Sequence, residues 1–135
     1  MDRITWIFGQ KLHSIEELFA FEKQYKIKFP DEYKEIVTAN DGASPVPQNF
    51  LVAGTERVFN YLVKVSDLQT MFVNICREYS CGKKLVPFAD DPAGNYICFD
   101  YSDNKTSPTV VFFELDRGQC FKIAEDFTEF INSLT

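Results

Sequence analysis

The 135-residue chain has few of the residues from which metal sites and acid-base catalysts are usually built. It has a single histidine, His13, and this residue lies far in sequence from the cysteines, which are Cys76, Cys81, Cys98 and Cys120. No pair of cysteines has the C-x-x-C spacing of a zinc site or a redox centre. We therefore expect no bound metal and reduced, partly buried thiols. A disulfide between Cys76 and Cys81 stays open as an alternative.

Long apolar runs and basic clusters are also missing. No run approaches the roughly 18 uncharged residues that span a bilayer, and the segment "MDRITWIFGQKLHS" lacks the pattern of a secretion signal. The formal net charge is -6, whereas a protein that tracks phosphates carries a basic stripe. We therefore expect a cytoplasmic protein that binds neither membranes nor nucleic acid directly.

Aromatic residues, by contrast, are abundant. They make up 16% of the chain and include 14 phenylalanines, within a hydrophobic content of 45%. This is too much apolar material for a disordered chain. A chain of this length buries on the order of two-thirds of its unfolded surface in one core, so we expect a single domain over residues 1–135.

The first half of the chain predicts helices separated by one strand. Ser14 and Glu17 form a capping-box pattern before a helix over 15–25, and a second, shorter helix follows Pro30 and ends near 40–42. Residues 43–55 have two prolines and no clear period, which indicates a loop or a short extended edge, and 56–65 reads as a strand. The capping-box pattern recurs at Ser66 and Gln69 and predicts a third helix, which Gly82 ends.

In the second half of the chain, from Leu85 on, the residue pattern becomes that of short strands. Four short β-branched and aromatic runs, separated by turn residues, predict an antiparallel meander over 85–89, 95–101, 109–115 and 120–123. A closing helix over 124–134 has one apolar face, formed by Phe127, Phe130, Ile131 and Leu134. The predicted order is α-α-β-α-β-β-β-β-α. This order indicates an α+β fold in which helices pack a mostly antiparallel sheet.

The segment "DDPAGNY" raises the question of a calcium or catalytic loop. A calcium site needs about six or more converging oxygens, but Asp90 and Asp91 are adjacent and no glutamate follows in register. Pro92 and Gly94 instead favour a tight turn, in which we expect exposed carboxylates that contribute little to stability. No nucleophile-base pattern, P-loop or dinucleotide motif is present. We therefore predict no catalytic residues, no cofactor and no enzymatic activity.

Four segments, in order, resemble the SMI1/KNR4 family of the SUKH superfamily: "FPDEYKEIVTANDG", "LVPFADDPAGNYICFDY", "PTVVFFEL" and "IAEDFTEFINSL". Residues 44–56 match no part of that pattern. The resemblance implies an α+β fold with a mostly antiparallel sheet and no catalytic residues. It also implies a binding role, because bacterial members are mostly viewed as immunity proteins that neutralise polymorphic toxins, many of them nucleases. Fungal relatives serve as regulatory hubs, so a scaffold without a toxin partner is the alternative.

Acidic residues outnumber basic ones by six to two between Leu85 and Gly118. They could steer a basic toxin domain, or they could only keep the protein soluble. If Ile97, Phe99 and Tyr101 face the core, Tyr96 and Asp100 face the other way and suit an interface, unless a helix covers that face. The partner-binding residues predicted on this basis are Asp90, Asp91, Tyr96, Asp100 and Asp103.

Overall fold

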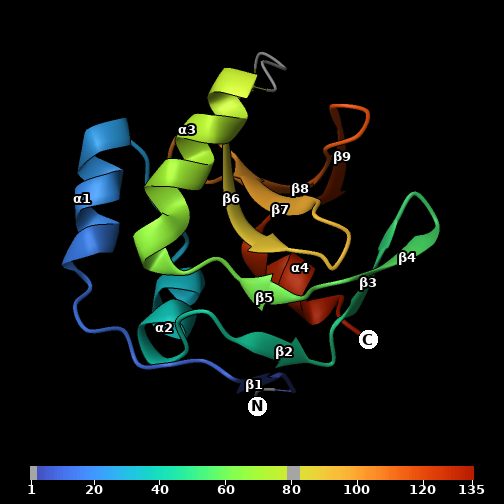
Figure 1. The fold of residues 1–135 in the computed structure, drawn as a ribbon, viewed down its shortest axis with the longest axis horizontal. Coiled ribbons are helices and arrows are strands. Elements are labelled where there is room, and N and C mark those ends of the chain that lie inside the picture. Colours follow the sequence, from blue (N-terminus) through green and yellow to red (C-terminus); the bar gives the residue numbers. More distant parts are fainter. Residues whose placement is uncertain (1–2, 79–82) are drawn as a thin grey trace.

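The computed structural model describes residues 3–78 and 83–135 (Figure 1). The helices are α1 (Glu16–Tyr25), α2 (Asp31–Ala39), the 3-10 helix η1 (Val65–Asp67), α3 (Leu68–Glu78) and α4 (Phe127–Asn132). The strands are β1 (Thr5–Ile7), β2 (Ser44–Val46), β3 (Asn49–Val52), β4 (Thr55–Val58), β5 (Tyr61–Leu62), β6 (Leu85–Asp90), β7 (Tyr96–Asp100), β8 (Thr109–Glu114) and β9 (Gln119–Ala124).

The main sheet has five antiparallel strands in the order β5-β6-β7-β8-β9. Its last four strands are the predicted meander, so the α+β class and the mostly antiparallel sheet are confirmed. β6 contains Pro87, which has no backbone N–H for the ladder, and the register shifts between Pro87 and Ala89. A bulge of this kind is where a sheet tolerates proline. Two further sheets have two strands each, β1-β2 and β3-β4.

The predicted order is wrong in the segment between α2 and α3. Residues 43–55, expected as a loop or short edge, contain β2 and β3, and the strand expected over 56–65 is divided into β4 and β5. Burial alternates along β3 as in an ordinary strand, since Phe50 and Val52 are buried while Leu51 is exposed. The two-residue turn between β3 and β4 uses positive φ angles at Ala53 and Gly54, which is the turn geometry that suits a hairpin. β1 was not predicted, because three residues are too few to show a period.

The helices themselves are confirmed, but their starts differ from the predicted caps. At α1 the Ser14 hydroxyl accepts a hydrogen bond from the N–H of Glu16 at 3.1 Å, one residue earlier than a capping box requires. α3 begins through η1, at which no side chain caps the helix start. α4 begins at Phe127 rather than 124, because β9 continues to Ala124 and Asp126 caps the helix by accepting from Glu129 N at 2.8 Å. The predicted end of the third helix at Gly82 lies outside the described residues.

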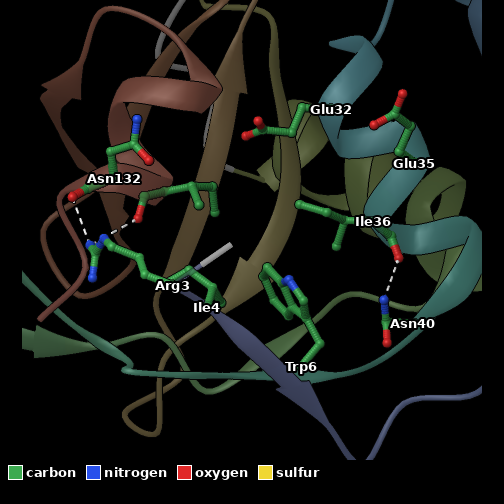
Figure 2. A pocket seen from close by; sticks show the side chains of 9 residues that line it. Arg3, Ile4, Trp6, Glu32, Glu35, Ile36, Asn40 and Asn132 are labelled. Carbon is green, nitrogen blue, oxygen red and sulfur yellow. Dashed lines mark hydrogen bonds between the residues drawn. The ribbon is translucent and has the colours of Figure 1, made fainter. Parts of the chain in front are cut away.

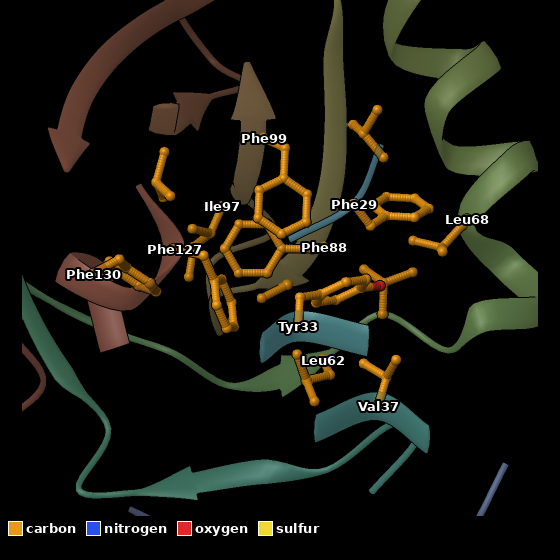
Figure 3. Packing of buried hydrophobic residues seen from close by; sticks show 14 of the residues in the cluster. Phe29, Tyr33, Val37, Leu62, Leu68, Phe88, Ile97, Phe99, Phe127 and Phe130 are labelled. Carbon is orange, nitrogen blue, oxygen red and sulfur yellow. The ribbon is translucent and has the colours of Figure 1, made fainter. Parts of the chain in front are cut away.

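The core is a phenylalanine cluster between the sheet and helices α2 and α4 (Figure 3). Phe88 and Phe99 stack across β6 and β7 with centroids 4.2 Å apart. Tyr33 from α2 and Phe127 from α4 contact Phe99 at 5.1 and 5.7 Å. The predicted apolar face of the last helix is confirmed, because Phe127, Phe130, Ile131 and Leu134 are all buried.

The opposite face of the sheet carries a second, smaller cluster. Cys98 and Val111 are buried there with Ile75, which comes from α3. The predicted alternation along β7 is therefore confirmed, with Ile97 and Phe99 in the main core and Cys98 on the other side. A helix does contribute to this second face.

Candidate partner-binding site

The β6-β7 turn is organised by the carboxylate of Asp91. Its Oδ1 accepts hydrogen bonds from Ala93 N at 3.0 Å and Asn95 N at 2.8 Å, and its Oδ2 accepts from Asn95 Nδ2 at 3.1 Å. Gly94 adopts a φ of 88° and donates its N–H to the Asp91 carbonyl. The turn prediction is confirmed, but the expectation of an exposed carboxylate is wrong at Asp91, which is only 5% exposed. This side chain satisfies backbone donors that the tight turn would otherwise leave unpaired.

Asp90 has a different environment from its neighbour. It ends β6, and its Oδ1 accepts from the N–H of Tyr61 on the edge strand β5 at 3.2 Å. Its carbonyl accepts from Asn60 N at 2.8 Å. Burial raises the pKa of the Asp90 carboxyl, and the Asp91 charge raises it further, while the hydrogen bond from Tyr61 lowers it. Asp90 is thus a half-buried carboxylate at the end of β6, next to the edge strand β5.

The five sequence-predicted residues are divided between the two ends of β6 and β7. Asp90 and Tyr96 are register partners at one end of β6 and β7, whereas Asp100 pairs with Leu85 at the other end. Tyr96 and Asp100 are four positions apart along β7, a distance of about 13 Å in a strand. Asp103 lies beyond that far end, exposed in the β7-β8 connection. Tyr96 is half-buried against the second cluster, so it is not the fully exposed anchor that strand alternation suggested.

Ion pairs reduce the acidic excess that the sequence shows. Glu114 lies 3.7 Å from Arg57 and 3.3 Å from Arg117. Asp100 lies 3.5 Å from Lys83. Arg57 also stacks over the Phe112 ring at 5.1 Å, which fastens the β3-β4 hairpin to the main sheet. Counting carboxylates therefore overestimates the charge that a partner meets.

Sequence reasoning missed a depression beside Asp90. Six residues that define it, here called the Phe8–Tyr61 depression, are Phe8, Tyr61, Lys64, Asp67, Met71 and Asp90. Its volume is about 480 Å³, within the range of about 300–1,000 Å³ that ligand clefts occupy. Phe8 is 77% exposed and Tyr61 is 42% exposed. No periodicity in the sequence marks Phe8, because a phenylalanine before a glycine reads most simply as core.

A second pocket of about 350 Å³ lies between β1, α2 and α4 (Figure 2). Trp6 from β1 and Ile36 from α2 form apolar parts of its wall, and Glu32 directs its carboxylate into the space between the two helices. The Arg3 guanidinium donates to the carbonyl of Asn132 at 2.7 Å and to that of Leu134. Carbonyls at a helix end need such donors, so Arg3 ties the first strand to the end of α4.

The cysteines do not come together as a metal site in the part of the chain that the structure describes. Cys76 is exposed on α3, Cys98 is buried and Cys120 is half-buried, while Cys81 lies outside the described residues. No group of three or more histidine, cysteine, aspartate or glutamate side chains among residues 3–78 and 83–135 is placed to hold an ion. None of the helices in these ranges is both long enough and apolar enough to cross a bilayer.

Comparison with known proteins supplies the family. The model of the SMI1/KNR4 family (SUKH-1) matches residues 13–133. No curated protein matches the chain. The matched range includes the β6-β7 turn and α4. It also includes residues 44–56, which correspond to no part of the family pattern seen in the sequence. The match covers nearly the whole chain, and the chain therefore belongs to the SMI1/KNR4 family (SUKH-1).

Proposed function

We propose that the protein is a non-enzymatic immunity protein that binds a co-produced toxin domain in the cytoplasm and blocks it by occlusion. The observation that carries this proposal is the family match over residues 13–133. Members of the family are generally immunity proteins rather than enzymes, and a binding role of this kind is consistent with the fold. Residues 1–135 would act as one binding domain.

The charge of the chain supports a basic partner. The formal net charge is -6, and a nuclease toxin has to present cations to phosphates. Opposite charges on two proteins raise the rate of encounter, with a strong dependence on salt. An acidic binding protein would thus occupy the same cationic surface that the toxin uses for its substrate.

The structure supports different roles for the sequence-predicted residues. Asp90 and Asp103 are the carboxylates that we propose to meet the partner. Asp91 is buried within the turn, and its role is to hold the β6-β7 connection in shape. Tyr96 and Asp100 are half-buried and would contribute at the margin of the interface.

The test is co-expression with a candidate toxin domain whose gene adjoins that of the protein. The toxin is induced in a bacterial host with and without the protein, and growth is measured. Restored growth, together with a one-to-one complex of the protein and a catalytically inactive toxin in calorimetry, is the expected result. No rescue and no complex would overturn the proposal. Stable complexes with host signalling proteins in the absence of rescue would favour the regulatory scaffold instead.

A further inference from the structure

Phe8 is held in an unusual backbone conformation with its ring in solvent. Its φ is 65°, a region that bulky residues seldom adopt and that costs on the order of 1–3 kcal/mol. Its side chain is nevertheless 77% exposed, so burial of the ring does not compensate for the strain. A large apolar side chain that is both strained and exposed does not serve the core.

The neighbouring residues fix this turn in place. A Cβ atom on Gly9 would lie 2.7 Å from the Cβ of Ala43 and 3.0 Å from the carbonyl carbon of Asn40, so only glycine permits this close approach. Gln10 and Asp41 exchange both backbone hydrogen bonds, at 3.0 and 2.7 Å. The Phe8 ring is therefore presented from a rigid base. A rigid anchor loses little conformational entropy when a partner binds.

Tyr61 also lines the depression. It belongs to β5, the edge strand of the main sheet, and its ring is partly exposed. Tyrosine is enriched among the residues that dominate protein interfaces. Two aromatic rings thus line a cleft of about 480 Å³ that also contains the side chain of Met71.

The charged groups of the depression leave an excess of negative charge. Lys64 packs its methylenes close to Gly42, and its charge interacts with the Asp41 carboxylate. Asp67 and Asp90 also line the depression. Within the described ranges, neither of these two carboxylates forms an ion pair. The desolvation that raises the pKa of Asp90 also disfavours its charged form, and a cation beside it would offset that penalty.

We propose that the Phe8–Tyr61 depression binds an arginine side chain of a basic protein partner, with the guanidinium against the two rings and its charge directed to Asp67 and Asp90. Arginine fits this site better than lysine, since its planar head stacks on aromatic rings and also donates to carboxylates. The assignment of a toxin as that partner rests on the proposed function above. The arginine site itself does not.

Other occupants suit the site less well. A second copy of this chain would bring another formal charge of -6 to a cleft that is itself acidic. A nucleic acid would bring phosphates next to Asp67 and Asp90. Both arrangements place like charges together, which is unfavourable at a desolvated contact.

The test uses N-acetylarginine amide as the probe, titrated into the isotope-labelled full chain and followed by NMR amide shifts. N-acetylcitrulline amide has nearly the same shape without the charge and is the ligand control. We expect saturable shifts at Phe8, Gly9, Tyr61 and Asp90 with the arginine probe. Binding of the citrulline probe should be at least about fivefold weaker, as expected for the loss of a cation-π contact and a charge pair.

Phe8→Ala and Asp90→Asn should each weaken binding of the arginine probe by a similar factor. Their matched controls are Phe19→Ala and Asp116→Asn, since Phe19 is another exposed phenylalanine and Asp116 is an exposed aspartate, and neither residue lines the depression. Thermal melts check that each variant is folded. If Phe8→Ala is unfolded, Asp90→Asn alone decides.

The outcomes separate the site from the proposed function. No saturable shift at the depression, or equal binding of arginine and citrulline, overturns the arginine site even if the protein protects against the toxin. Saturable arginine binding without toxin protection supports the site and counts against the immunity role. If Phe19→Ala or Asp116→Asn weakens binding of the arginine probe as much as the depression variants do, the cation binds elsewhere and the assignment is wrong.

Discussion

Replacing Asp91 by asparagine should destabilise the fold, although the change removes one charge and keeps the shape of the side chain. Oδ1 of Asp91 accepts from two backbone N–H groups, and Oδ2 accepts from the side-chain amide of Asn95. That amide cannot rotate freely, because its own Oδ1 accepts from Leu115 N at 3.1 Å. With asparagine at position 91, one NH2 group has to face either backbone donors or the NH2 of Asn95.

The size of the effect follows from this conflict. Losing one buried hydrogen bond and leaving its donor unsatisfied costs about 1–3 kcal/mol. Losing the charge that strengthens the two remaining hydrogen bonds adds roughly 0.5–1 kcal/mol. The free energy of unfolding should therefore fall by about 1.5–4 kcal/mol, a large part of the roughly 5–15 kcal/mol that a domain of this kind has.

Urea denaturation at neutral pH measures the effect, with Asp90→Asn and Asp103→Asn as controls. Asp90→Asn keeps an Oδ1 acceptor for Tyr61 N and relieves a desolvated charge, so its midpoint should be unchanged or higher. Asp103 is exposed, so its variant should stay within about 0.5 kcal/mol of the wild type. If Asp91→Asn unfolds at the wild-type midpoint, the hydrogen bonds of Asp91 do not hold this turn and the reasoning fails.

Three further predictions use the same measurement. Phe127→Ala and Phe130→Ala should each lower the unfolding free energy by about 3–5 kcal/mol, because both rings are buried; unchanged midpoints would show that α4 is not packed. Tyr33→Phe should be neutral or stabilising by about 1 kcal/mol, since the Tyr33 hydroxyl is buried without a hydrogen-bond partner in the described structure; a loss of more than about 1 kcal/mol would reveal a partner. Burial raises the folded-state pKa of Asp90, so its contribution to stability is fullest below its unfolded pKa and is lost as pH rises through the folded value. The stability of Asp90→Asn should therefore rise relative to that of the wild type as the pH increases above about 4, the ordinary pKa of an aspartate, and a difference that is constant with pH would contradict this.

The helices and the meander were predictable because each repeats its pattern over enough residues. In β7, for example, Ile97 and Phe99 alternate with Cys98 across the two faces, and α4 places four apolar residues on one side. The segment 43–55 was not predictable in the same way. Its strands have three or four residues, and the hairpin turn uses Ala53-Gly54 instead of a more recognisable Asn-Gly pair.

Among the residues that line the Phe8–Tyr61 depression, Asp90 is the one that the sequence had suggested for partner binding. Sequence counts charges but not their partners, and Glu114 and Asp100 prove to be ion-paired. Phe8 could not be found, because most phenylalanines of this chain are in the core. Its exposure depends on the contact of Gly9 with residues 40–43, a close approach between segments about 30 positions apart.

The adjacency of Asp90 and Asp91 has a consequence for interpreting variants. Asp91 fixes the turn that follows β6, and the Asp90 backbone and side chain in turn accept hydrogen bonds from Asn60 and Tyr61. A change at Asp91 should therefore displace Asp90 and the Tyr61 ring without any direct contact between Asp91 and a partner. Weaker binding by Asp91→Asn would then accompany lower stability, whereas Asp90→Asn would weaken binding while stability is kept. This opposite coupling distinguishes a residue that positions the binding surface from one that forms it.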